Sequence, residues 1–238
     1  MIPAAARAEA EETLARWGTP LGEEGWARLD LYLRDVLEYG RKTNLTAALD
    51  TGELLRRHAL DALAALGPLR RRLGDAPRLL DLGCGAGFVG ICLQIAWPQA
   101  RVTLVESVYR KVCFLHWTRA HLKLANLQVV HGRSAGGMVH RLGAGGGRQA
   151  SATDAPADGA DAVLARALAK FPEAAALAAP LARRGGTVAL HQSRPPDPED
   201  PPTREALQAA GLALEEGFAY TLPGETVARH VVLLRRTE

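Results

Sequence analysis

Apolar residues recur at helical spacing through the first third of the chain. In residues 23–39 they fall on one face of a helix, and the same pattern returns in residues 54–66, with Pro68 placed to end that second helix. A weaker helical pattern covers residues 4–17. Together these helices predict an N-terminal helical segment, which we place at residues 1–76.

After Pro77 the pattern changes to short apolar runs separated by helical stretches. Five such runs occupy residues 78–82, 101–106, 127–131, 161–166 and 185–191. Strands that alternate with helices indicate a parallel sheet covered on both faces. Two further runs flank Pro223-Gly224 with no room for a helix between them, so we expect an antiparallel hairpin at the sheet edge.

A seven-stranded, mostly parallel sheet with a C-terminal antiparallel hairpin is the usual build of Rossmann-like class I S-adenosylmethionine-dependent methyltransferases. This α/β domain would cover residues 77–238. Residues 143–160 contain almost nothing to bury and are interpreted as a flexible Gly-rich insertion after the third strand. Residues 193–202 are rich in proline and are interpreted as a second surface connection.

The first strand of this sheet runs into a glycine-rich turn. Gly85, Gly87 and Gly90 have G-x-G-x-x-G spacing, with Gly83 just ahead and Phe88 at the start of the next helix. Such a turn lets a cofactor approach backbone N–H groups, so we assign Gly83, Gly85, Gly87 and Phe88 to a cofactor site. Tight packing alone is the alternative. The spacing suits either a nicotinamide dinucleotide or S-adenosylmethionine.

Asp81 separates these two cofactors. A carboxylate near the turn repels a pyrophosphate, whereas the ammonium group of S-adenosylmethionine gains a charge-assisted hydrogen bond from it. Asp81 therefore favours S-adenosylmethionine. The alternative role for this residue is to cap the turn or the following helix.

Acidic and polar residues follow the next two strands. Glu106 ends the second strand, where a carboxylate can accept hydrogen bonds from both hydroxyls of a ribose. Ser107 and Val108 come directly after it, and Arg133 and Ser134 follow the third strand. We expect these four residues to line the adenine part of the cofactor site.

Composition narrows the class of protein only a little. The chain is 47% hydrophobic and 23% charged, which is typical of a folded globular protein. Its three cysteines lack metal-site spacing, and no apolar run is long enough to span a membrane. We therefore expect no metal, no membrane contact and a cytoplasmic location. A net charge of +3 is weak evidence for an anionic partner.

Six short motifs occur in the order found in one family of enzymes. They are RKTNLTA (41–47), RHALDA (57–62), LDLGCGAGFVGI (80–91), VESVYRKVCFL (105–115), ARALA (165–169) and ARHVVLL (228–234). In these motifs the chain resembles the RsmG (GidB) family, methyltransferases that modify N7 of one guanine in small-subunit ribosomal RNA. The resemblance implies S-adenosylmethionine as cofactor and 16S rRNA, or the assembling small subunit, as partner. We also expect the protein to act as a monomer.

The resemblance also implies roles for individual residues. The glycine turn would surround the methionine part of the cofactor, and Glu106 would bind its ribose. Arg133, Arg166 and Arg229 match arginines around the substrate side of the family's pocket, so we expect them to be catalytic. Arg133 and Arg166 would contact the cofactor as well. Structural or solvated cations are the alternative for each.

The chain also departs from the family pattern. His191-Gln192 replaces a lysine followed by glycine, and Ser134 follows Arg133 where the family usually has an acid. His191 would be either a pH-dependent cation near the RNA or a buried neutral imidazole. Three other functions are also compatible with the sequence: a methyltransferase with another substrate, a nicotinamide-dependent reductase, and an inactive scaffold with this fold.

Residues 1–75 contain 11 basic and 12 acidic residues, so any RNA-binding surface there must be local. The runs Arg41-Lys42, Arg56-Arg57 and Arg70-Arg71-Arg72 could supply it, or could simply be solvated.

Overall fold

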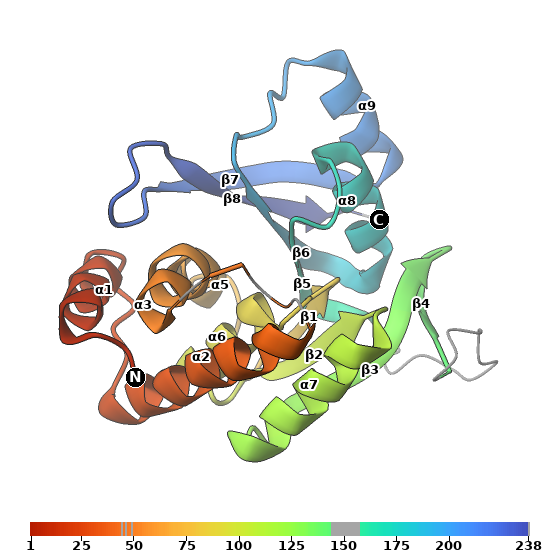
Figure 1. The fold of residues 1–238 in the computed structure, drawn as a ribbon. Coiled ribbons are helices and arrows are strands. Elements are labelled where there is room, and N and C mark those ends of the chain that lie inside the picture. The colour runs from red at the N-terminus through yellow and green to blue at the C-terminus, as the bar shows by residue number, and fades with distance from the viewer. Residues whose placement is uncertain (44, 46, 49, 144–157, 238) are drawn as a thin grey trace.

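One mixed sheet forms the centre of the protein (Figure 1). The computed structural model describes residues 1–43, 45, 47–48, 50–143 and 158–237, and in that part of the chain the sheet has eight strands in the order β4-β3-β2-β1-β5-β6-β8-β7. The strands are β1 (Arg78–Leu82), β2 (Arg101–Glu106), β3 (Leu127–Ala135), β4 (Met138–Arg141), β5 (Ala160–Arg166), β6 (Ala182–Gln192), β7 (Leu212–Tyr220) and β8 (Arg229–Arg236).

The predicted fold class is confirmed. Strands β1, β2, β3, β5 and β6 pair in parallel, and β8 pairs antiparallel with both β6 and β7. The sheet has eight strands and not the predicted seven, because β4 was not predicted. It pairs antiparallel with the end of β3 across a turn at Gly136 and Gly137, which have φ of +56° and +78°. Val139 is the one fully buried residue of β4, too weak an apolar signal to mark a strand.

Alternate residues of the central strands are buried in two separate cores. In β1, Leu79 packs toward the helices on one face, and Leu80 packs toward those on the other. Burial on both faces explains why these strands have continuous apolar sequences. The first core is covered by α6 (Phe88–Ala96), α7 (Tyr109–His121) and the N-terminal helices, and the second by α8 (Phe171–Ala178), η2 (Ala179–Leu181) and α9 (Pro201–Ala209) (Figure 1).

The N-terminal helices are α1 (Ala4–Arg16), α2 (Glu23–Thr43), α3 (Thr51–Leu54), α4 (Leu60–Leu63) and α5 (Leu66–Arg70), with a π-helical turn η1 (Leu55–Ala59) between α3 and α4. The helix predicted for residues 54–66 is present, but it begins at Thr51, contains this π-helical turn and ends at Leu63. Pro68 lies inside α5 and does not end a helix, because the N–H that proline lacks has no partner in a first turn. Leu14, Leu33 and Leu104 share one core, so these helices pack directly on the sheet domain. The division at residue 76 stays a prediction.

The two predicted surface connections have different outcomes. Residues 144–157 of the Gly-rich insertion lie outside the described residues. The proline-rich connection is shorter than predicted, since α9 begins at Pro201, where the side chain of Asp200 accepts a hydrogen bond from the Thr203 amide at 3.1 Å. Within the described residues, no helix has the length and apolar character needed to cross a membrane.

Candidate cofactor and substrate site

The turn between β1 and α6 needs glycine for its backbone conformation. Gly83, Gly85 and Gly87 have φ of +67°, +62° and +87°, a region that residues with a Cβ rarely adopt. The Gly83 amide donates to the carbonyl of Val105 at 2.9 Å, which ties the turn to β2. The turn is therefore held open at the carboxyl ends of β1 and β2.

Two glycines of this turn serve different purposes. A Cβ on Gly90 would lie 2.2 Å from a methyl group of Leu104, so Gly90 allows α6 to pack closely on the sheet. A Cβ on Gly85 would meet no atom within 4 Å. Gly85 thus has open space in front of it at the tip of the turn, as expected of a cofactor cradle.

Asp81 has the capping role that the sequence left open. It is buried, and its Oδ2 accepts a hydrogen bond from the Gly90 amide at 2.8 Å, in the first turn of α6. Burial raises the pKa of Asp81 to about 6, although the Gly90 hydrogen bond and Arg166 act in the opposite direction. Its predicted bond to the cofactor ammonium stays a prediction.

The carboxylate of Glu106 accepts hydrogen bonds from a backbone amide of the glycine turn and from one in the segment that follows β2. Its Oε2 accepts from the Gly85 amide at 2.9 Å, and its Oε1 accepts from the Val108 amide at 2.7 Å. Each carboxylate oxygen can accept one further hydrogen bond. The carboxylate therefore fixes the glycine turn and retains acceptor capacity for a ribose, while Val108 beside it is 37% exposed.

The N-terminal helices hold the glycine turn from the other side. Tyr32 of α2 donates to the carbonyl of Ala86 at 2.9 Å. The ring of His58, in η1, stacks on that of Phe88 with centroids 4.7 Å apart, and the guanidinium of Arg166 lies 5.4 Å from the Phe88 centroid. Phe88 is buried and packs against both groups, and its predicted contact with the cofactor stays a prediction.

A pocket of about 700 Å³ lies beside this turn, at the carboxyl ends of β5 and β6. We call it the Asp61 pocket. Its polar wall consists of Arg57, His58, Asp61, Arg166, His191, Gln192, Ser193, Tyr220, Glu225 and Arg229. Ala167 follows Arg166 with φ of +52°, a left-handed conformation that is costly for a residue with a Cβ and is often found at functional sites.

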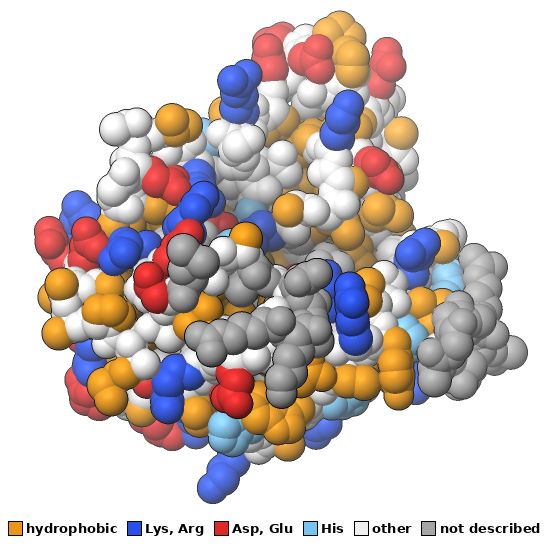
Figure 2. Space-filling model, viewed as in Figure 1, with side chains coloured by type: hydrophobic (Ala, Val, Ile, Leu, Met, Phe, Trp, Pro, Cys, Tyr) orange, Lys and Arg blue, Asp and Glu red, His pale blue; other side chains and the backbone are white. Residues whose placement is uncertain are grey.

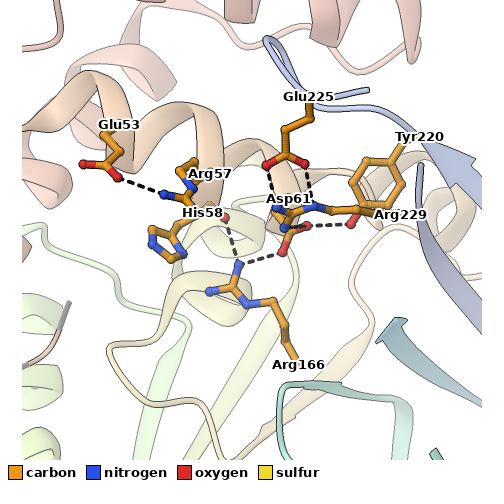
Figure 3. Close-up of polar contacts among 8 residues, drawn as sticks. All are labelled: Glu53, Arg57, His58, Asp61, Arg166, Tyr220, Glu225 and Arg229. Atoms are coloured by element: carbon orange, nitrogen blue, oxygen red, sulfur yellow. Dashed lines mark hydrogen bonds and ion pairs between the residues drawn. The ribbon is translucent and has the colours of Figure 1, made fainter. Parts of the chain in front are cut away.

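Asp61 is the centre of the polar wall (Figure 3). Its Oδ2 accepts from Arg166 Nη1 at 2.9 Å, and its Oδ1 accepts from Tyr220 at 2.7 Å and from Arg229 Nη1 at 3.0 Å. Burial would raise the pKa of Asp61, but the charges of His191, where its ring is protonated, and of Arg166, with the hydrogen bonds from Tyr220 and Arg166, outweigh burial and lower the pKa. Asp61 is therefore ionised at neutral pH.

Arg229 is held by two carboxylates. Besides its bond to Asp61, its Nε and Nη2 donate to the two oxygens of Glu225 at 2.9 and 2.7 Å (Figure 3). Arg166 donates through Nη1 to Asp61 and to the His58 carbonyl, at 2.9 and 3.2 Å. Among the residues that the structure describes, Nε and Nη2 of Arg166 have no hydrogen-bond partner, so Arg166 keeps donors for a ligand.

Arg166 and Arg229 thus line one pocket, whereas Arg133 is exposed on β3 and is not part of its wall. Ser134 donates to the carbonyl of Leu177 on α8 at 3.2 Å, which gives its hydroxyl a structural role. The contribution of Arg133 and Ser134 to a cofactor site stays a prediction.

Asp61, Tyr220 and Glu225 have no role predicted from the sequence. Asp61 and His58 belong to the RHALDA motif, and a carboxylate inside an apolar helix was the available signal for the first of them. Asn44 and Thr46, from the RKTNLTA motif, lie outside the described residues.

His191 takes the second of its two predicted roles. It is 6% exposed, and burial, with help from Arg166 and Arg229, lowers its pKa to about 4 despite the opposing charge of Asp61. The imidazole is therefore neutral between pH 6 and 8. It cannot act there as the pH-dependent cation that was the other possibility.

The arginine runs of the helical segment are largely engaged with acids. Arg56 pairs with Glu9 and Arg57 with Glu53, while Arg71 and Arg72 pair with Glu216 of β7. Figure 2 likewise shows basic and acidic side chains interspersed over the visible face near these helices. These four arginines therefore form ion pairs within the protein and do not form a continuous basic surface. The side chains of Arg41 and Lys42 lie outside the described part of the chain.

The sheet order, the glycine turn and the acid at the end of β2 define the fold of class I methyltransferases. A Pyrococcus furiosus methyltransferase structure has a TM-score of 0.52 over 90% of this chain and 98% of that chain, at 14% identity. Precorrin-6y C5,15-methyltransferase from Geobacter metallireducens has a TM-score of 0.50 over 81% and 96%, at 16% identity. At such identities the likeness concerns the fold alone.

The chain belongs to the GidB family, described as rRNA small subunit methyltransferase G, whose model matches residues 26–212. Two relatives carry the name ribosomal RNA small subunit methyltransferase G. The one from Ralstonia nicotianae is 34% identical, over 96% of this chain and 94% of its own length. The one from Chloroflexus aggregans is 32% identical, over 94% and 87%. The family resemblance of the six motifs is thereby confirmed.

Proposed function

We propose that this protein transfers a methyl group from S-adenosylmethionine to N7 of a guanine in small-subunit (16S) ribosomal RNA. Family membership supports the reaction. The observation that carries the assignment of a site is the Asp61 pocket, in which Asp61 holds Arg166 beside the glycine turn.

The residues around the glycine turn fit S-adenosylmethionine, which supplies an electrophilic methyl group. Gly85 offers open space where a Cβ would stand, and Glu106 has acceptor capacity left for ribose hydroxyls. Asp81 brings a carboxylate within reach of the first turn of α6 and disfavours a pyrophosphate there. This combination supports S-adenosylmethionine over a nicotinamide dinucleotide.

The Asp61 pocket suits an uncharged planar base. The charges of Arg166 and Arg229 are balanced by Asp61 and Glu225, so the wall attracts a phosphate only weakly. Guanine N7 carries a lone pair and no proton, and its methylation therefore requires alignment but no general base. Alignment alone can supply a large part of a rate enhancement. Arg166, with donors left over, is placed to orient the base.

The RNA backbone needs a basic surface outside the pocket, and α7 supports that role. This helix contains Arg110, Lys111 and Arg119 and no acidic residue, and its Tyr109 and Trp117 rings are 50% and 44% exposed. Basic side chains interleaved with exposed aromatic rings suit phosphates and unstacked bases. Within the described residues, none of the three cations has an ion-pair partner.

We also propose that the protein acts as a monomer in the cytoplasm, where its RNA substrate is assembled. Light scattering of the purified protein tests whether it is a monomer.

In the described part of the chain, no group of three His, Cys, Asp or Glu side chains could hold a metal ion.

The decisive experiment maps N7-methylguanine in small-subunit rRNA from cells with and without this protein. We expect one guanine to lose its methyl group when the protein is absent. Purified protein with S-adenosylmethionine should restore it, on either naked rRNA or assembled subunits. An inactive scaffold would bind the cofactor without transfer, and unchanged methylation in cells would contradict the proposed function.

A further inference from the structure

His191 lies near the carboxyl end of β6, between two other strands of the sheet. Its backbone is in register with Arg166 of β5 on one side and Val231 of β8 on the other. The side chain is only 6% exposed, yet it forms part of the wall of the Asp61 pocket with Arg166 and Arg229. It is a buried polar group in the wall of a cavity, and both of its ring nitrogens are covered.

Neither ring nitrogen of His191 has a hydrogen-bond partner among the described residues. Two residues beside it have hydrogen bonds at every polar side-chain atom: both oxygens of Asp61 and all three nitrogens of Arg229. A buried polar group without a partner costs free energy, and such groups are rare in native proteins. The missing partner of His191 is therefore a feature that requires an explanation.

The ionisation of the surrounding groups limits what that partner can be. His191 is neutral above about pH 4, so its ring offers one donor and one acceptor. The charged groups facing it are Arg166 and Arg229, with Asp61 opposing them, and Glu225 balances the second arginine. An uncharged group with its own donors and acceptors fits this wall better than a phosphate does.

We propose that His191 is a substrate-binding residue whose ring forms a hydrogen bond with the polar edge of the target guanine in the Asp61 pocket. This inference rests on the proposed function. The imidazole is unpaired in the absence of RNA, and both of its nitrogens are covered. It gains its partner when the base enters and the ring turns toward it. The free energy lost by leaving the ring without a partner in the unbound protein is then recovered when the substrate binds. His191 is therefore a determinant of substrate recognition and not of folding.

The test compares His191→Leu, which removes the polar atoms, with His191→Gln, which keeps a donor and an acceptor. For His191→Leu we expect kcat/KM for rRNA methylation to fall roughly tenfold or more, the usual effect of losing a hydrogen bond to a bound substrate. S-adenosylmethionine affinity should be unchanged by calorimetry. Its melting temperature should be unchanged or higher, because an unsatisfied buried group has been removed. His191→Gln should keep most of the transfer.

Thr187→Val is the matched control, since Thr187 is a buried polar residue in the middle of β6 that does not line the Asp61 pocket. It should leave kcat/KM unchanged. A His191→Leu protein that methylates rRNA as well as wild type would overturn the inference. So would a large drop in its melting temperature, which would mean that His191 is structural. Failure of the wild-type protein itself to form N7-methylguanine, with cofactor binding intact, would instead refute the proposed function and this inference with it.

Discussion

Arg166 Nη1 lies 2.9 Å from Asp61 Oδ2, and this ion pair joins the end of β5 to helix α4, 105 residues earlier in the chain. The same guanidinium packs over Phe88 at the start of α6. Three parts of the protein therefore meet at one charge pair: the N-terminal helices, the glycine turn and the central sheet. The geometry of the pocket depends on the helices that precede the sheet.

Asp61→Asn should disrupt this arrangement. An asparagine leaves Arg166 and Arg229 without their shared anion, and its NH2 group opposes their donors. Because both arginines are partly exposed, we expect a loss of about 1 to 3 kcal/mol in the free energy of unfolding, below the usual cost of breaking a fully buried pair. Urea denaturation measures that loss. Methyl transfer should fall much further than S-adenosylmethionine affinity.

Asp161→Asn is the control for that substitution. Asp161 pairs with Arg78 and Arg183 at the opposite end of β5, away from the Asp61 pocket. The Asp161→Asn substitution should lower the free energy of unfolding and leave methyl transfer unchanged. Equal loss of activity in both variants would show that Asp61 acts only through the stability of the fold.

Arg166→Ala and Arg229→Ala should have different consequences. Arg166 keeps donors for the base, so Arg166→Ala should retain cofactor affinity and lose transfer by roughly a hundredfold, as misplacement of a reactant can do. Arg229 is fully engaged with Asp61 and Glu225, so its removal should also lower the melting temperature. Calorimetry, thermal unfolding and a transfer assay separate the two variants.

The control is Arg183→Ala, because Arg183 lies outside the Asp61 pocket. Loss of cofactor binding in Arg166→Ala would contradict the proposed role of Arg166.

Glu106→Ala should weaken S-adenosylmethionine binding by about 1 to 3 kcal/mol, the cost of leaving polar groups unpaired. Two backbone amides lose their acceptor in this variant, so the glycine turn should also become less ordered. Calorimetry should show binding of S-adenosylmethionine to the wild type and no binding of NAD(H) or NADP(H). Tight binding of either nicotinamide cofactor would contradict the methyltransferase assignment.

The sheet was predictable because its central strands are buried on both faces. Residues such as Leu79 and Leu80 serve different cores, so each strand is a continuous apolar run that stands out in the sequence. Strand β4 escaped prediction for the opposite reason, since it has a single buried apolar residue. The π-helical turn escaped because the apolar spacing of residues 54–66 indicates a helix but does not distinguish a π-helical turn from an α-helical one.

The candidate site was predictable in its backbone but not in its side-chain network. A glycine spacing and a strand-end acid mark Gly85 and Glu106 without reference to the rest of the chain. The role of Asp61 depends on contacts with Arg166, Tyr220 and Arg229, which are 105 to 168 residues away. No local pattern contains that information. The sequence could therefore name two of the arginines but not the carboxylate that holds them together.

Asp81→Asn should change how stability depends on pH. Burial raises the pKa of Asp81 from about 4 to about 6, so the folded protein holds the proton of this carboxyl more tightly than the unfolded chain does. The contribution of Asp81 to stability is therefore most favourable below pH 4. It declines as the pH rises through 6, where the folded protein must bury a charged carboxylate.

Asparagine keeps an oxygen for the Gly90 amide and carries no charge at any pH. The difference in unfolding free energy between Asp81→Asn and wild type should be close to zero near pH 4 and grow to between about 1 and 3 kcal/mol in favour of the variant at pH 8. Urea denaturation at several pH values measures this difference and cancels the titration of all other groups. If Asp81 also binds the ammonium of S-adenosylmethionine, the stabilised variant should bind the cofactor more weakly. A variant less stable than wild type at pH 8 would show that the carboxylate charge itself stabilises the turn.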